Sequence, residues 1–127
     1  MNNTRVILII EDEIDIAELL SIFFETLGYK GKICSTYKDV VETLQETIPW
    51  AIFCDFLLPD ARGDYIYKML KTRDINLVKR FVLMTGTLIE GDIMDFINTE
   101  NLLVLQKPFS IETLQDLISR LEKQTGE

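Results

Sequence analysis

The stretch ILIIEDEIDI, residues 7–16, runs four aliphatic residues directly into three acids. The aliphatic run is typical of a buried strand, and Glu11, Asp12 and Glu13 follow where that strand ends. Acids are also common at the start of a helix, where the helix dipole is positive. The stretch alone therefore fits either a solvated helix start or a functional acidic site, and the rest of the chain decides between them.

Strand-like and helix-like segments alternate from this stretch to the end of the chain. We expect strands at residues 5–10, 30–35, 50–56, 80–85 and 102–105, and helices at residues 14–27, 36–48, 65–72, 89–98 and 111–121. This alternation predicts an α/β fold in which a five-stranded parallel sheet is covered by helices on both faces. We expect a single domain over residues 1–127, with a core at about residues 5–123 and no effector domain in this chain.

The spacing of apolar residues predicts the inner face of each helix. Thr36 and Ser110 are expected to cap the second and the last helix. The residues expected to face the core are Ile16, Leu20, Phe23 and Leu27 in the first helix, Val40, Leu44 and Ile48 in the second, and Ile111, Leu114, Ile118 and Leu121 in the last.

Composition excludes several classes of function. Of the 127 residues, 47% are hydrophobic, yet no apolar run approaches the roughly 20 residues that span a bilayer. We read no signal peptide and expect a cytoplasmic protein without a membrane partner. The net charge of −8 argues against direct nucleic-acid binding. The absence of histidine excludes His-based catalytic triads and the common zinc sites, and Cys34 and Cys54 are expected to be buried free thiols.

Polar residues follow the strands at the points where ligands bind in parallel sheets. Glu11 and Asp12 follow the first strand, Asp55 ends the third, Thr85 ends the fourth, and Lys107 follows the fifth. Because parallel strands end at one edge of the sheet, we expect these side chains to converge. Two carboxylates about 4 Å apart repel by about 4 kcal/mol at an effective dielectric constant of 20. We therefore expect a divalent cation there, and oxygen ligands favour Mg²⁺ over zinc.

A carboxylate beside Mg²⁺ indicates phosphoryl chemistry, since it can form an aspartyl-phosphate. We expect Asp55 to be the nucleophile, with Lys107 and Thr85 contacting the phosphoryl oxygens and Gly86 leaving room for the group. A phosphatase is a weaker interpretation, because Leu57 lacks the acid–base group expected two residues after the nucleophile. A nucleotide-binding protein is weaker still, since no glycine-rich phosphate loop follows the first strand.

Four segments together resemble the response-regulator receiver domain of two-component signalling: IIEDE (9–13), IFCDFLLPDARG (52–63), LMTG (83–86) and QKPF (106–109). The resemblance covers residues 5–123 and implies a flavodoxin-like sheet of order 2-1-3-4-5. It implies that Asp55 accepts a phosphoryl group from a histidine kinase or a phosphotransfer protein. It also implies that Glu11, Asp12, Asp55 and the backbone carbonyl of Leu57 bind Mg²⁺. Thr85 resembles the switch hydroxyl, and Lys107 resembles the lysine that precedes a proline, often in a cis peptide bond.

The sequence departs from the receiver pattern at several positions. Glu11 stands where the family more often has Asp, and Val104 stands where receivers often have a switch aromatic. Leu57 cannot orient an attacking water, and Thr87 is a weak substitute, so we expect slow loss of the phosphoryl group. Residues 99–101, TEN, replace a turn of small residues.

The leading hypothesis is a phosphorylation-controlled signalling module whose output partner the sequence does not identify. The module is either a complete single-domain regulator or a receiver cut from a longer chain. The alternative is a constitutive protein-binding scaffold with a receiver fold that phosphorylation does not control. Val104 favours the scaffold, whereas the intact set of Asp55, Thr85 and Lys107 favours the signalling module.

Overall fold

A computed structural model describes residues 4–86 and 89–125. Within these residues, five strands form one parallel sheet, as the alternating pattern predicts, in the order β2-β1-β3-β4-β5 that the resemblance implies. The strands are β1 (Val6–Ile10), β2 (Lys30–Cys34), β3 (Ala51–Asp55), β4 (Phe81–Thr85) and β5 (Leu103–Gln106). The three central strands are almost wholly buried, which explains their continuous aliphatic sequences.

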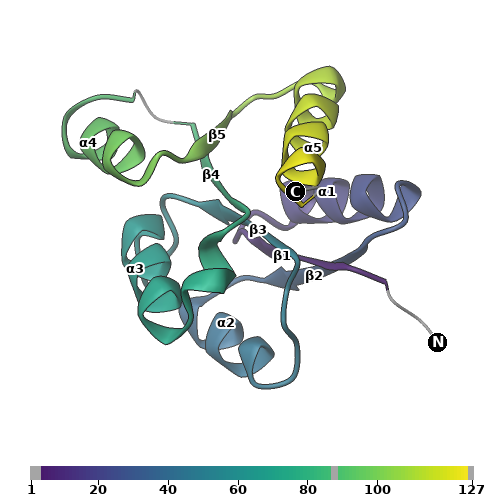
Figure 1. Ribbon diagram of the computed structural model, residues 1–127, viewed down its shortest axis with the longest axis horizontal. Coiled ribbons are helices and arrows are strands. Elements are labelled where there is room, and N and C mark those ends of the chain that lie inside the picture. The colour runs from purple at the N-terminus through teal and green to yellow at the C-terminus, as the bar shows by residue number, and fades with distance from the viewer. Residues whose placement is uncertain (1–3, 87–88, 126–127) are drawn as a thin grey trace.

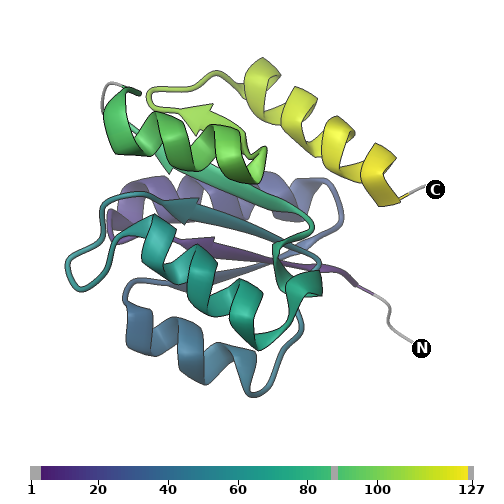
Figure 2. The same ribbon diagram turned by 60° about the vertical axis from the view of Figure 1, so that its left-hand side comes forward.

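Five α-helices cover the two faces of this sheet in the described part of the chain. They are α1 (Ile14–Thr26), α2 (Tyr37–Leu44), α3 (Gly63–Arg73), α4 (Gly91–Glu100) and α5 (Ile111–Thr125), with a short 3-10 helix, η1 (Ile75–Val78), before β4. Helices α1 and α5 lie on one face, and α2, α3 and α4 lie on the other (Figures 1 and 2). None of the described helices is both long enough and apolar enough to span a bilayer.

Each face of the sheet has its own apolar core because strand side chains alternate between faces. Ile7, Ile9 and Phe53 point toward α1 and α5, where Leu20, Phe24 and Leu121 pack against them, among others. On the other face, the core includes Leu8, Ile10, Ile52, Leu83, Val40, Ile66 and Leu70. Cys34 and Cys54 belong to this second core as buried free thiols, as expected.

The predicted caps form, but three helix faces differ from the prediction. The Thr36 side chain accepts a hydrogen bond from the Asp39 N–H at 3.1 Å, and Ser110 Oγ accepts one from the Thr113 N–H at 3.1 Å. In α1 the buried residues are Ala17, Leu20 and Phe24, whereas Leu27 lies beyond the helix and is 44% exposed.

The two other wrong assignments concern Ile48 and Ile111. Helix α2 ends at Leu44 and the chain turns, so the side chain of Ile48 is 86% exposed instead of packing on the core. Ile111 is the first residue of α5 and is 46% exposed. The inner face of α5 instead includes Leu117, which the spacing did not predict and which is buried with Leu114, Ile118 and Leu121.

Candidate functional site

All the predicted strand-end residues meet at the carboxyl edge of the sheet. Asp55 ends β3, Thr85 ends β4, Glu11 follows β1 and Lys107 follows β5. The edge encloses an open hollow of about 260 Å³ lined by Asp12, Glu13, Asp55, Leu57, Gly86 and Lys107. The hollow lies where the strand order reverses between β1 and β3, which is the usual ligand position in this kind of sheet.

The ammonium group of Lys107 lies among three carboxylates. Its Nζ atom is 2.6 Å from Glu11 Oε1, 3.4 Å from Asp55 Oδ1 and 3.7 Å from Glu13 Oε1. The side chains of Lys107 and Asp55 are only 13% and 10% exposed, so water screens this pair weakly. The contact with Glu13 lies at the exposed rim, and the sequence analysis did not include Glu13 in the site.

Glu11 is completely buried, although it carries a charge. Its Oε1 atom contacts Lys107, and its Oε2 atom accepts a hydrogen bond from the Glu13 N–H at 3.2 Å. Burying a charge is costly unless it is paired and hydrogen-bonded, and here each carboxylate oxygen has a partner. The contact with Lys107 is therefore the interaction that compensates the burial of the Glu11 side chain.

Burial and charge shift the acidity of this site. Burial, together with the nearby Glu11 carboxylate, raises the pKa of Asp55 from its ordinary value of 3.8 to about 6, although Lys107 opposes the rise. Burial lowers the pKa of Lys107, but Glu11 and Asp55 outweigh it and raise that pKa above its usual range. At neutral pH Asp55 is thus mostly ionised beside the Lys107 ammonium group.

The acidic residues are close enough to share one ion. Carboxylate oxygens of Glu11, Asp12 and Asp55 lie within 4.8 Å of one another. Oxygens on opposite sides of one Mg²⁺ ion are about 4 Å apart, because each Mg–O distance is about 2.1 Å. An all-oxygen donor set of this spread, open to water on the Asp12 side, fits Mg²⁺.

Comparison with known families agrees with this geometry. A sequence profile of the response regulator receiver domain matches residues 7–119. The chain belongs to the response regulator receiver domain family. It is therefore a receiver domain of two-component signalling, with the flavodoxin-like sheet that the resemblance implied.

Known receivers share the fold at low sequence identity. The response regulator SaeR of Staphylococcus aureus (strain USA300) is 26% identical over 121 residues, which cover 92% of this chain and 52% of SaeR. The chain thus spans about half the length of the curated relatives that it matches. The receiver domain of a DNA-binding response regulator from Colwellia psychrerythraea 34H superposes with a TM-score of 0.81 at 26% identity, covering 94% of this chain and 98% of that one. A two-component response regulator from Clostridium difficile superposes with a TM-score of 0.84 at 21% identity, covering 98% and 100%.

The other described residues of the predicted receiver site lie on β4 and β5 or directly after β5. Thr85 is 1% exposed, and its carbonyl accepts a hydrogen bond from the Lys107 N–H at 2.9 Å. The Lys107–Pro108 peptide bond is cis, as the resemblance implied. Val104 is half-buried on β5, paired with Leu83 of β4. Thr87 lies outside the described residues.

The loop after Asp55 packs tightly against the start of α3. Leu57 and Arg62 form an antiparallel bridge, and the Leu58 N–H donates to the Ala61 carbonyl at 3.2 Å. A Cβ added at Gly63 would lie 2.8 Å from the backbone oxygen of Asp55, so only glycine fits there without a shift. Gly63 is the last residue of the segment DARG, residues 60–63, which was part of the receiver pattern. Its close approach to the backbone of Asp55 is visible only in the structure.

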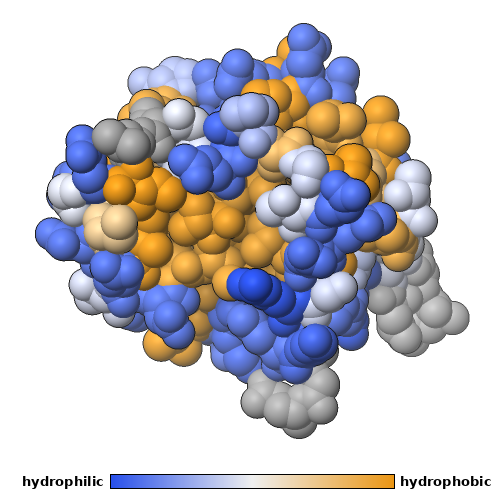
Figure 3. Space-filling model, turned by 90° about the horizontal axis from the view of Figure 1, so that it is seen from above, coloured by the Kyte–Doolittle hydropathy of each residue, from blue (hydrophilic) through white to orange (hydrophobic). Residues whose placement is uncertain are grey.

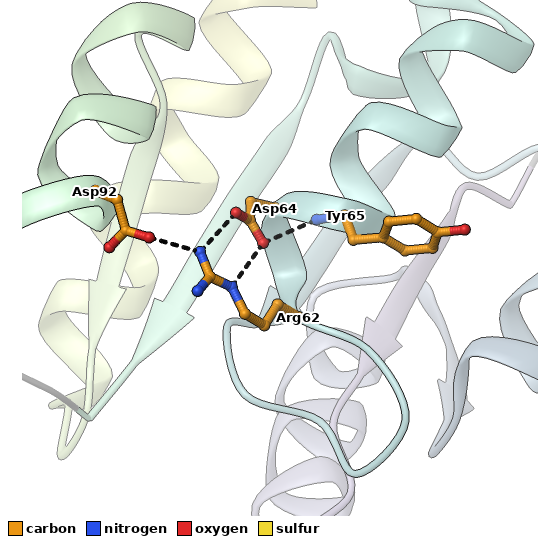
Figure 4. A network of polar contacts seen from close by, with 4 residues as sticks. All are labelled: Arg62, Asp64, Tyr65 and Asp92. Carbon is orange, nitrogen blue, oxygen red and sulfur yellow. Dashed lines mark hydrogen bonds and ion pairs between the residues drawn. The ribbon is translucent and has the colours of Figure 1, made fainter.

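Arg62 links this loop to α4, a connection that sequence analysis missed. Its guanidinium group binds both carboxylate oxygens of Asp64, at 3.1 and 2.8 Å, and also Asp92 of α4 at 3.0 Å (Figure 4). The other end of α4 is held by Tyr67 and Lys71, which both donate to Glu100 at 2.9 Å. No residue of α4 is fully buried, so the helix is held by the partly buried Ile93, Phe96 and Ile97, which pack on the core, together with these exposed polar contacts with α3.

Proposed function

We propose that this receiver accepts a phosphoryl group on Asp55 from a histidine kinase or a phosphotransfer protein, in a Mg²⁺-dependent reaction. The observation that carries the proposal is the convergence of the Asp55 carboxylate, the Lys107 ammonium and the acidic pair at one hollow. Response regulators as a class receive phosphoryl groups from histidine kinases, which supports this assignment.

Each residue has a role in the proposed transfer. An oxygen of the Asp55 carboxylate forms a bond to phosphorus while the bond from phosphorus to the donor's imidazole nitrogen breaks, and that nitrogen keeps the electron pair. Lys107 holds a phosphoryl oxygen by its charge, and the Thr85 hydroxyl donates to another. Glu11, Asp12, Asp55 and the Leu57 carbonyl would hold Mg²⁺, which when bound neutralises charge on the phosphoryl oxygens.

The proposed output is a change in the surface formed by α4, β5 and α5. Apolar atoms gather between α4 and α5 over the sheet (Figure 3), and Met94 and Ile111 are 39% and 46% exposed on these helices. Phosphorylation adds about −1.5 to −2 charges, which draws Thr85 and the following loop inward. Since Val104 replaces the usual aromatic, movement of that loop and of α4 carries more of the signal in this proposal.

Acetyl phosphate tests the acceptor directly. Wild-type protein incubated with acetyl phosphate and Mg²⁺ is expected to gain the mass of one phosphoryl group, whereas Asp55→Asn gains none. Asp60→Asn, the same change in the exposed loop after β3, is the matched control and should be phosphorylated like wild type. An equal mass gain in Asp55→Asn, or none in wild type, would refute the proposal.

A second candidate is a scaffold that binds its partner without phosphorylation, and Val104 is the observation that favours it. Beryllium fluoride with Mg²⁺ mimics a phosphoryl group on aspartate. Under the signalling proposal it shifts the amide NMR resonances of α4, β5 and the loop after Thr85. A spectrum that stays unchanged at saturating beryllium fluoride would favour the scaffold.

We expect the phosphorylated protein to lose its phosphoryl group slowly, because Leu57 is 53% exposed and apolar at the rim of the hollow. Leu57→Asn supplies an amide that can orient an attacking water but not remove its proton, so it is expected to shorten the half-life by about tenfold, less than the roughly 100-fold or more of full general-base catalysis. The decay is measured by mass spectrometry after the donor is removed. A wild-type half-life of seconds at neutral pH with Mg²⁺ would contradict this expectation.

A further inference from the structure

The amino edge of the sheet, opposite the acidic hollow, carries a second and larger hollow. It measures about 490 Å³ and is lined by Thr4, Arg5, Val6, Ile48, Pro49, Trp50, Asn76, Lys79 and Arg80, which we call the Trp50 hollow. Trp50 immediately precedes β3 and Asp55 ends it, so the two hollows lie at opposite ends of one strand of about 16 Å.

The charge of the Trp50 hollow is opposite to that of the whole molecule. Three of its lining residues are basic and none is acidic, in a chain whose net charge is −8. Lys79 and Arg80 also line a neighbouring hollow together with Lys123, where Glu100 is the one acidic residue among the described lining residues. The molecule is therefore polarised along the strands, with acids at the carboxyl edge and a local basic surface at the amino edge.

Two of the cations are held in place by the indole ring. The guanidinium carbons of Arg5 and Arg80 lie 4.8 and 5.1 Å from the centroid of the Trp50 ring. Tyr29 stacks on the same ring at 5.1 Å, and Arg80 donates to the Trp50 carbonyl at 3.3 Å. Glu122 binds Arg5 from outside the hollow at 2.8 Å. Cations fixed before binding lose less conformational entropy when a partner arrives.

An exposed apolar side chain completes this surface. Ile48 is 86% exposed at the rim, and Pro49 and Trp50 lie beside it. Tryptophan and arginine are among the residues most enriched in binding hot spots between proteins. A long polyanion such as nucleic acid would also meet the repulsion of the strongly acidic remainder of the molecule. We propose that the Trp50 hollow binds an acidic peptide segment of a partner protein, with carboxylates on Lys79 and Arg80 and an aliphatic side chain on Ile48.

The single tryptophan of the chain makes the proposal directly testable, because its fluorescence reports on the hollow itself. The probe is a short synthetic peptide in which pairs of glutamates flank single leucines, titrated into the full chain at low ionic strength. We expect a saturable change in Trp50 emission that weakens as salt is added. The same peptide with glutamine in place of glutamate is expected to bind at least tenfold more weakly.

Lys79→Glu reverses one exposed charge of the hollow and is expected to weaken peptide binding about tenfold. Lys68→Glu makes the same change at an exposed position of α3 and is expected to stay within about twofold of wild type. Equal weakening by both variants would mean unspecific charge attraction and would overturn the proposal. So would the absence of saturable binding up to about 1 mM peptide. A single-stranded oligonucleotide that binds more tightly than the peptide, in a Lys79-dependent manner, would overturn it in favour of a nucleic-acid site.

Discussion

Lys107→Met is expected to lower the free energy of unfolding by about 3 kcal/mol at pH 7 without divalent cations. Methionine keeps most of the side-chain volume but removes the ammonium group that lies 2.6 Å from Glu11 and 3.4 Å from Asp55. Removing one partner of a buried ion pair typically costs about 3–5 kcal/mol, because the other charge stays buried and unpaired. The low end applies here, since the hollow is open to water on the Asp12 side.

Urea unfolding in the presence of EDTA measures this loss, and a titration with Mg²⁺ follows. The cation is expected to narrow the difference between Lys107→Met and wild type, because it supplies the positive charge that the variant lacks. Lys68→Met, at an exposed position of α3, should change stability by no more than about 0.5 kcal/mol. If Lys107→Met lowered the free energy of unfolding by less than about 1 kcal/mol, the charge of Lys107 would not be needed to stabilise the buried carboxylates.

The fold was predictable because its determinants are local and repeated. Continuous aliphatic runs such as ILII at residues 7–10 occur where a strand is buried on both faces, and the structure buries all four residues. The site was predictable for a topological reason. In a parallel sheet, residues that end successive strands must share one edge, so Asp55, Thr85 and Lys107 converge although up to 52 residues separate them.

The wrong predictions concern residues near the ends of helices. The contacts that were not predicted join residues far apart in the sequence. Helical spacing placed Ile48 on the core only if α2 continued, but the chain turns after Leu44. The same spacing placed Ile111 inward, but the first turn of α5 leaves it 46% exposed. The bridge from Arg62 to Asp92 joins residues 30 positions apart on two separate helix starts, and no periodic pattern encodes such a pair.

A substitution at Asp55 is also expected to change the free energy of unfolding strongly, but it should raise it, whereas Lys107→Met lowers it. The rise of its pKa from 3.8 to about 6 means that the folded protein holds this proton more tightly than the unfolded chain does. Wild type therefore loses stability as the pH rises through this range, because ionised Asp55 is buried beside Glu11. The shift corresponds to about 3 kcal/mol, and screening by water at the open side of the hollow reduces the expected effect to about 2 kcal/mol.

Asp55→Asn removes that charge in nearly the same shape, so in EDTA at pH 7 it is expected to be about 2 kcal/mol more stable than wild type. The difference should shrink as the pH falls and vanish near pH 3, below both pKa values, where Asp55 is protonated in wild type whether folded or unfolded. Mg²⁺ should reduce the difference at pH 7, because it stabilises wild type and has one carboxylate ligand fewer in the variant. Urea unfolding from about pH 3 to 7, with Asp60→Asn as control, measures each of these effects. A gain of the same size at both ends of the range would mean that amide packing, and not relief of charge repulsion, stabilises the variant.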